Sequence, residues 1–285
     1  MIEFSNVTKN YGKNTAMDNF SIKIDQPGMY CLLGRNGAGK TTLMKLLAGN
    51  VAASEGTITV NGEAAGPLAM PESVHFVETG ATQFNMRLAD LFKAAAEVNL
   101  SFDVPFAMGL ARRFQLDASK RYKHLSFGMK AMVNTVIAMA SGRDILLLDE
   151  PVLGFDPVMR KVFYELLSES CAGSTKTVIV STHIIDEIEK TAERLIIIDR
   201  GKKVLFCDMA EIDEKAYCVT GISESVQAAT AGLNIISETK AGGFMTRHIY
   251  DQRIEASEKY SVSSLGLTDF FVSLVGREQN SGEAM

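Results

Sequence analysis

The residue types with the clearest chemistry lie at positions 34–41, which read Gly-Arg-Asn-Gly-Ala-Gly-Lys-Thr. This stretch matches G-x-x-x-x-G-K-[ST], the pattern of a phosphate-binding loop. Its glycines let backbone N–H groups converge on phosphate oxygens without side chains in the way. Lys40 supplies a positive charge for the β- and γ-phosphates, and the Thr41 hydroxyl suits Mg²⁺. The pattern therefore predicts binding of ATP or GTP.

The sequence on either side gives this loop the context that the chemistry needs. Residues 29–33 form a short apolar run typical of a strand, and residues 42–48 have the periodicity of a helix. A helix that begins at the loop adds its partial positive charge to an anion site. The structural alternative is a plain glycine-rich turn, and the order of strand, loop and helix makes it the poorer interpretation.

A pair of carboxylates follows the apolar run 145–148. Asp149 and Glu150 stand at its end, and ligands of open α/β sheets bind beyond the carboxyl ends of the strands. Asp149 can hold Mg²⁺ directly or through water, and Glu150 can polarise a water that attacks the γ-phosphate. Alone, the pair could equally be an acidic cap on a following helix. Together with the phosphate-binding loop, it favours nucleotide hydrolysis.

Two weaker signals lie elsewhere in the chain. His183 follows the apolar run 178–180, whose end should lie beside Asp149, so its imidazole could reach the γ-phosphate or the attacking water. A lone histidine is more often structural. Ser126 is a good helix N-cap, and Gly128 would let the backbone approach an anion closely. These two residues predict a second phosphate-binding helix N-terminus, although serine before a helix is common.

The elements that must position these residues differ along the chain. Early runs at 2–7, 20–24 and 56–60 alternate apolar and polar residues, which is typical of an antiparallel sheet with one solvated face, and Asn61-Gly62 predicts a hairpin turn. Later runs are continuously apolar, as expected for parallel strands covered on both faces. These runs are 145–148, 178–180 and 195–198, and the predicted helices between the strands are 84–98, 105–114, 126–140 and 157–170.

The chain changes character beyond residue 213. A strand is predicted at 216–219, an amphipathic helix at 268–275 and a frayed tail at 279–285. The expected fold is α/β, a P-loop NTPase with a mostly parallel core sheet, an antiparallel β subdomain and a helical subdomain at about 84–140. Residues 1–213 would form the nucleotide-binding domain, and residues 214–285 a small α+β C-terminal extension.

Composition excludes several classes of function. The chain has 285 residues, 46% of them hydrophobic, with a formal net charge of −5, so nucleic acid is a disfavoured partner. No apolar run approaches the roughly 20 residues that cross a bilayer, and the N-terminus lacks the pattern of a signal peptide. The four cysteines have no metal or redox spacing, and Cys31 lies in a predicted core strand, so we interpret them as reduced structural thiols.

With these motifs in this order, the chain resembles the ATP-binding cassette (ABC) family, and specifically the nucleotide-binding subunit of an ABC transporter, over about residues 1–213. The resemblance implies that Glu150 is the catalytic carboxylate and His183 the switch histidine, and that Thr41, Asp149 and Glu78 hold Mg²⁺. It also identifies 153–156 as the D-loop and Tyr11 as the aromatic residue that stacks on adenine. The implied ATP-binding residues are Tyr11, Gly34, Arg35, Asn36, Gly37, Ala38, Gly39, Lys40, Thr41, Thr42, Ser126 and Gly128.

The chain departs from the family pattern at three motifs. In the signature, residues 125–129, Phe127 replaces the first glycine and Met129 the glutamine. Glu78 follows a predicted strand where the Q-loop glutamine is usual, with Gln83 further on, and the D-loop carries Phe155. A carboxylate at position 78 could still contact Mg²⁺. These variants look most like bacterial ABC-2-type exporter ATPases, including those tied to antimicrobial peptide resistance.

The resemblance also implies partners. Two cassettes would pair head to tail, as a homodimer or heterodimer, with ATP between the loop of one and the signature of the other. Hydrolysis would drive a separate membrane permease, contacted through residues 80–91, from the cytoplasmic face of the cell membrane. The alternatives are a soluble ABC-type ATPase acting on ribosomes or DNA, and a nucleotide sensor. A single cassette and an acidic balance argue against the first. The intact catalytic residues argue against the second, while the altered signature keeps it open. The C-terminal extension would be a stabilising cap or a regulatory or dimerising appendage.

Overall fold

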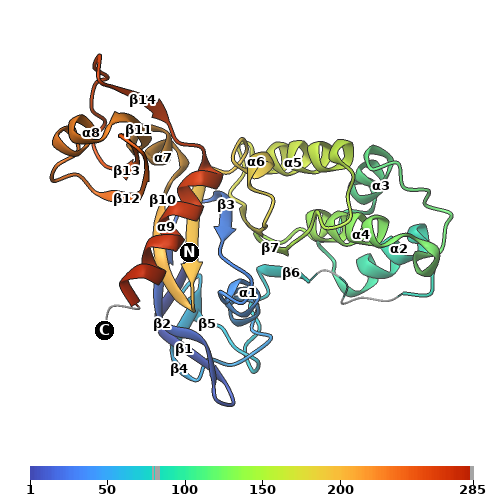
Figure 1. The fold of residues 1–285 in the computed structure, drawn as a ribbon. Coiled ribbons are helices and arrows are strands. Elements are labelled where there is room, and N and C mark those ends of the chain that lie inside the picture. The colour runs from blue at the N-terminus through green and yellow to red at the C-terminus, as the bar shows by residue number, and fades with distance from the viewer. Residues whose placement is uncertain (79, 81–83, 283–285) are drawn as a thin grey trace. The chain divides into compact units, whose positions relative to one another are not determined.

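The computed structural model describes residues 1–78, 80 and 84–282, and it divides into two compact units, Met1–Leu205 and Phe206–Met285 (Figure 1). The chain passes from the first unit to the second within strand β10 (Lys202–Asp208). Helix α7 (Met209–Lys215) packs on strands of the second unit, so the division falls before the boundary predicted near residue 213. The assignment of 1–213 and 214–285 as functional domains stays a prediction.

The N-terminal strands form an antiparallel sheet in the order β2-β1-β4-β5. Its strands are β1 (Ile2–Tyr11), β2 (Asn14–Ile24), β4 (Glu55–Val60) and β5 (Glu63–Ala64). Alternate side chains of β2 are buried, which explains the alternating pattern in the sequence. The hairpin predicted at Asn61-Gly62 is confirmed, because both residues have positive φ between β4 and β5.

The core of the first unit is a six-stranded sheet in the order β10-β9-β3-β8-β7-β6. Besides β10 it contains β3 (Gly28–Leu33), β6 (Val74–Glu78), β7 (Ile145–Asp149), β8 (Thr177–Ser181) and β9 (Arg194–Asp199). The pairs from β9 through β6 are parallel, which confirms the prediction from the continuously apolar runs. Every residue of β3 and β7 is buried, so the strands that precede the candidate motifs are rigidly held.

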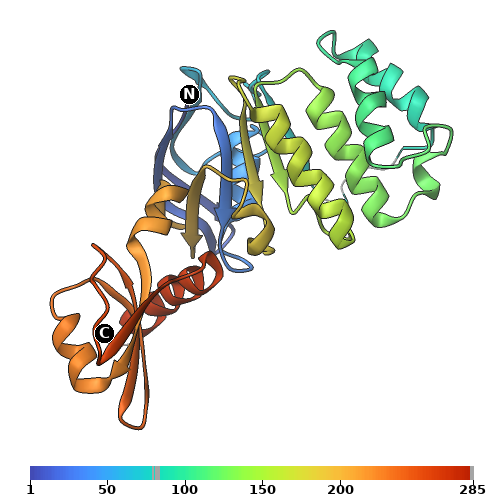
Figure 2. The same ribbon diagram turned by 90° about the horizontal axis from the view of Figure 1, so that it is seen from above.

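The helices of the first unit cover this sheet and extend from it. Its helices are α1 (Lys40–Leu47), α2 (Leu88–Val98), α3 (Val104–Arg113), α4 (Phe127–Ala140), α5 (Pro157–Cys171) and α6 (Ile185–Ile188), with a 3₁₀ turn at Tyr122–His124. Helices α1 and α4 pack against β7, α5 packs against β3, and α2, α3 and α4 pack on one another (Figure 2). The predicted helical subdomain is therefore present.

One helix boundary was predicted wrongly. Residues 84–87 are not helical, and α2 begins at Leu88. Arg87 forms an isolated β-bridge with Arg121, and the Tyr122 N–H donates to the Met86 carbonyl at 3.0 Å. These long-range backbone hydrogen bonds hold the segment extended, and a helical reading of the sequence could not anticipate them.

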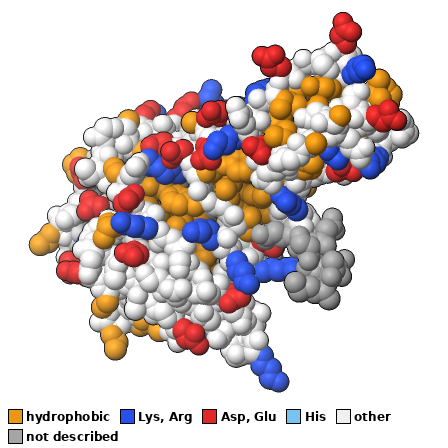
Figure 3. Space-filling view, turned by 90° about the vertical axis from the view of Figure 1, so that its left-hand side faces the viewer, with side chains coloured by type: hydrophobic (Ala, Val, Ile, Leu, Met, Phe, Trp, Pro, Cys, Tyr) orange, Lys and Arg blue, Asp and Glu red, His pale blue; other side chains and the backbone are white. Residues whose placement is uncertain are grey.

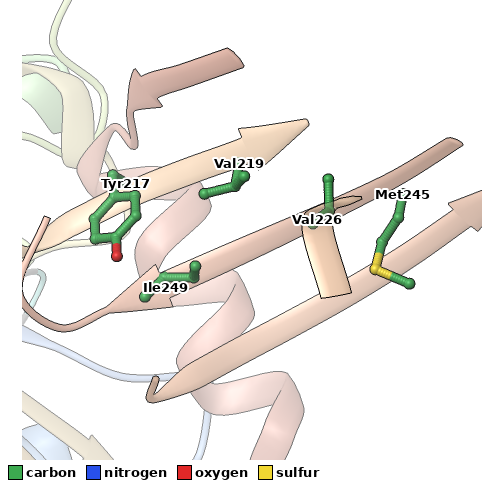
Figure 4. Close-up of a cluster of buried hydrophobic side chains, with 5 residues drawn as sticks. All are labelled: Tyr217, Val219, Val226, Met245 and Ile249. Carbon is green, nitrogen blue, oxygen red and sulfur yellow. The ribbon is translucent and has the colours of Figure 1, made fainter. Parts of the chain in front are cut away.

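The second unit has its own antiparallel sheet in the order β12-β13-β11-β14. Its elements are β11 (Ala216–Ile222), α8 (Ser223–Ala229), β12 (Ile235–Ala241), β13 (Phe244–Tyr250), β14 (Tyr260–Ser264) and α9 (Leu267–Gly282). Five buried side chains from β11, α8 and β13 form its core: Tyr217, Val219, Val226, Met245 and Ile249 (Figure 4). The tail predicted at 279–285 is wrong up to Gly282, which α9 includes, and residues 283–285 lie outside the described part.

The surface and the helix lengths bear on possible partners. Within the part of the chain that the structure describes, no helix combines the length and the apolar character needed to cross a bilayer. Basic and acidic side chains are intermixed on the face shown in Figure 3.

Candidate functional site

The loop that matches the phosphate-binding pattern connects β3 to α1, as predicted. Gly39, the N-cap of α1, has φ +107°, and a Cβ there would lie 2.6 Å from the Ala16 carbonyl oxygen, so this position accepts only glycine. The Lys40 ammonium donates to the Gly34 carbonyl at 2.7 Å and holds the loop closed beneath it. Residues 35–37 are exposed at the tip, whereas Lys40 is buried. The loop thus presents backbone N–H groups and a cation at the start of a helix, which is an anion-binding arrangement.

The predicted carboxylates lie at the adjoining sheet edge. In the strand register, Asp149 of β7 stands beside Glu78 of β6 on one side and Ser181 of β8 on the other. The Thr41 hydroxyl donates to Asp149 Oδ2 at 2.6 Å, so the loop and the acidic strand end meet directly. The sequence assigned both residues to Mg²⁺, Thr41 from the loop pattern and Asp149 from its place at a strand end, and the structure brings the two together.

The candidate catalytic pair is formed across β7 and β8. His183 Nδ1 lies 2.7 Å from Glu150 Oε2. Glu150 has φ +49°, a left-handed conformation that is uncommon for a residue with a side chain and marks a constrained turn. The side chains of Glu150 and His183 are 23% and 56% exposed, so a water molecule can reach both groups. The expectation that His183 lies beside the acidic strand end is met.

Glu78 has a partner that the sequence did not suggest. Its Oε1 lies 2.7 Å from the Lys45 ammonium on α1, and both side chains are about one-third exposed. Its place in the register beside Asp149 keeps it near the candidate metal position, although one of its oxygens is engaged by a cation. Gln83, the other candidate for this loop, lies outside the described residues.

Ser126 and Gly128 lie at the start of α4, as expected. The Ser126 hydroxyl caps the helix by accepting a hydrogen bond from the Met129 N–H at 3.2 Å. A Cβ on Gly128 would lie 2.4 Å from the Gly154 carbonyl oxygen, so the helix start packs directly on the backbone of the turn 153–155. Phe127 also borders Gly154 and is 48% exposed. The contacts of this helix end are with that turn, and the second anion site stays a prediction.

Tyr11 lies at the end of β1 and is 46% exposed. The Lys9 ammonium lies 4.9 Å from the centroid of its ring. The exposed ring agrees with a stacking role.

We expect Tyr11→Ala to weaken ATP binding about 5- to 100-fold, since stacking of a base on an aromatic ring contributes about 1–3 kcal/mol. Calorimetric titration with ATP measures this, and affinity equal to that of the unmodified protein would mean that Tyr11 is only a surface aromatic.

A cavity of about 300 Å³ lies next to Glu78. Its lining residues come mainly from β6 and α4: Asn50, His75, Phe76, Val77, Glu78, Phe84, Asn134 and Ile137. Burial, and secondarily the nearby Arg143, lowers the pKa of His75 to about 4, so this imidazole is neutral near pH 7. The cavity is therefore lined mostly by uncharged groups beside the carboxylate that ends β6.

Two site residues escaped the sequence analysis. Lys45 is one turn into α1, where a lysine on a helix face gives no distinguishing signal. Ser181 ends the apolar run of β8, and only the strand register reveals that it stands beside Asp149. A polar residue at the end of an otherwise apolar strand was the available signal for Ser181.

Comparisons with known proteins agree with this geometry. A model of the family described as ABC transporter matches residues 17–153. The chain is 33% identical over 216 residues to Nod factor export ATP-binding protein I of Paraburkholderia xenovorans (strain LB400), covering 71% of this chain and 69% of that protein. It is 26% identical over 252 residues to ABC transporter ATP-binding protein YtrB of Bacillus subtilis (strain 168), covering 86% and 85%. The dimeric structure of a bacterial ABC transporter cassette has the same fold, with a TM-score of 0.65, 21% identity and coverage of 73% and 99%.

Proposed function

The chain belongs to the ABC transporter family as an ATP-binding protein and ATP hydrolase, and we propose that it powers a separate membrane permease of the exporter type. One observation carries the catalytic part of this proposal. The phosphate-binding loop meets the acidic strand end through Thr41 and Asp149, and beside them Glu150 contacts His183 at 2.7 Å. A cation, a metal-holding carboxylate and a general base with a histidine partner are the groups that ATP hydrolysis needs.

Within this site each side chain takes a distinct role. Lys40 and the loop N–H groups hold the phosphates of ATP. Glu150 accepts the proton of the attacking water, and His183 orients the Glu150 carboxylate or donates to the γ-phosphate. Tyr11, whose ring is exposed, would stack on the adenine, as the family resemblance implies. The residue types and the Glu150–His183 distance support the roles of the other side chains.

The donor set at Thr41 and Asp149 fits Mg²⁺. The Thr41 hydroxyl and Asp149 Oδ2 lie 2.6 Å apart, so two oxygen donors of the kind that Mg²⁺ prefers already meet beside the phosphate-binding loop and would hold the ion. Among the described residues no cluster of three or more His, Cys, Asp or Glu side chains forms a metal cage. A small number of protein ligands is sufficient for Mg²⁺ in nucleotide sites, because phosphates and water complete its coordination. When bound, the ion neutralises charge on the phosphates, and Glu78 is a candidate for contact through water.

The proposal includes pairing with a second cassette, head to tail. Ser126 and Gly128 lie at a helix N-terminus whose close contacts are with the turn 153–155, and they would serve the ATP that a partner holds. Two phosphate-binding helix starts then stabilise more charge than one loop can. The dimeric state of the similar cassette supports pairing, and the partner would be either a second copy or a related chain.

The permease contact is proposed beside Glu78. The predicted contact segment, residues 80–91, lies partly outside the described residues, but the cavity lined by His75 and Phe84 adjoins it. Contact here would place the chain at the cytoplasmic face of the membrane as a peripheral subunit. The export function of the named relative supports the exporter type.

Purification from native membranes tests the transport role. We expect the tagged chain, extracted in mild detergent, to carry an integral membrane protein in stoichiometric amount and to release phosphate from ATP. ATP turnover without a membrane partner would favour a soluble ATPase. A chain that binds ATP without turnover would favour a nucleotide sensor.

A further inference from the structure

Ser181 occupies a position that joins both carboxylates of the site. It is the last residue of β8, it is fully buried, and it pairs in register with Asp149. Its hydroxyl donates to Asp149 Oδ1 and accepts a hydrogen bond from the Glu150 N–H at 3.1 Å. The Glu150 N–H is also 3.1 Å from the Ser181 carbonyl oxygen. One buried hydroxyl thus contacts both Asp149, the proposed metal ligand, and Glu150, the proposed general base.

The contact fixes the Asp149 carboxylate. Oδ1 accepts from Ser181 while Oδ2 accepts from Thr41 at 2.6 Å, so each oxygen has its own hydrogen-bond donor. A carboxylate held at both oxygens cannot rotate about its Cβ–Cγ bond without losing a charge-assisted hydrogen bond. Its Oδ2 therefore stays aimed at the phosphate-binding loop.

The same hydroxyl holds the backbone at Glu150. This residue adopts φ +49°, and its N–H is tied to Ser181 through both the carbonyl and the hydroxyl oxygen. The direction in which the side chain leaves that backbone determines its contact with His183. Of these two contacts, Ser181→Ala would keep only the one to the carbonyl oxygen.

We propose that Ser181 is a positioning residue for ATP hydrolysis, which orients the Asp149 carboxylate toward the metal and the Glu150 carboxylate toward the attacking water. This inference rests on the proposed roles of Asp149 and Glu150. A merely structural serine would satisfy its own hydroxyl inside β8, and its loss would change stability without changing the response to Mg²⁺. The proposal instead ties the hydroxyl to the metal dependence of nucleotide binding.

Two variants test it: Ser181→Ala, which removes the hydroxyl, and Ser181→Cys, which keeps the size but donates weakly. Ser141→Ala is the matched control, since Ser141 is 1% exposed and its hydroxyl donates to the Ala138 carbonyl at 2.6 Å in α4. The measurements are the ATP dissociation constant with Mg²⁺ and with EDTA, the Mg²⁺ concentration for half-maximal phosphate release, kcat and the melting temperature.

We expect both variants at 181 to bind ATP in EDTA with an affinity within about twofold of that of the unmodified protein. In contrast, they should need about 10-fold more Mg²⁺ for half-maximal phosphate release, and their kcat should fall about 10- to 100-fold. Losses of this size are typical of a lost hydrogen bond to a charged group. Ser141→Ala should keep both values. Unchanged Mg²⁺ dependence and kcat in a folded variant at 181, or equal losses in Ser141→Ala, would overturn the proposal. If the unmodified protein gains no ATP affinity from Mg²⁺, the proposed metal site itself fails.

Discussion

Glu150→Gln is expected to abolish steady-state phosphate release, with a loss of about 100- to 10,000-fold, while ATP affinity stays within about twofold. The amide has the shape of the carboxylate and can still contact His183 Nδ1, which lies 2.7 Å from Oε2 in the unmodified protein. It cannot accept a proton from water near pH 7, so binding and chemistry separate. A cassette that binds ATP without consuming it should also accumulate as an ATP-bound dimer.

Phosphate release, calorimetric titration and light scattering with and without ATP measure these three effects. Glu165→Gln is the matched control, because Glu165 lies on α5 in an exposed pair with Lys161 and the substitution removes the same charge away from the site. Retention of near-normal phosphate release in Glu150→Gln would reject the assignment of Glu150 as general base. A monomer that binds ATP but never dimerises would leave the base assignment intact and contradict the pairing.

The sequence predicted the site where local pattern and chemistry coincide. The loop at 34–41 needs its strand and its helix next to it in the chain, so periodicity was sufficient to find β3 and α1. The continuous apolar run of β7 required burial on both faces, and burial in a parallel sheet places Asp149 at the edge where the loop opens. The Thr41–Asp149 contact therefore follows from two local patterns and one rule about sheets.

Contacts that depend on strand register could not be predicted. Ser181 acts on Asp149 because β8 pairs with β7 at one particular offset, and a shift by one residue would turn its hydroxyl to the other face. Lys45 reaches Glu78 because α1 packs near the end of β6, and no spacing in the sequence encodes that approach. Registers and helix positions are set by the packing of the whole core.

The C-terminal unit was harder to read for a different reason. Strands β12 and β14 are edge strands with mostly polar, half-exposed residues, so they lack a strong apolar periodicity. Only β11 and β13 bury a full row of side chains, and the start of β11 was the piece predicted as a strand. A sheet whose edge strands are half-exposed leaves a weak apolar periodicity in the sequence, whereas the buried strands of the nucleotide-binding core leave a strong apolar signal.

Lys40→Ala is the second substitution with a large expected effect. We expect the ATP dissociation constant to rise about 10- to 100-fold, because a hydrogen bond to a charged group contributes about 1.5–3 kcal/mol. The Lys40 ammonium donates to the Gly34 carbonyl at 2.7 Å and lies 3.4 Å from the Arg35 carbonyl, so it is already ordered over the loop before nucleotide arrives. Little further entropy is lost when it contacts phosphate, which makes its full electrostatic contribution available for binding.

Because Lys40 is only 8% exposed, its alkyl stem also packs in the loop, and alanine removes that packing together with the charge. Lys40→Met separates the two effects, since it keeps most of the stem. Equal loss of ATP affinity in the Met and Ala variants, with the melting temperature of the Met variant preserved, would assign the effect to the ammonium. Calorimetric affinity unchanged in both variants would mean that backbone N–H groups and the α1 N-terminus alone hold the phosphates, and the loop would then bind ATP without the cation that its pattern supplies.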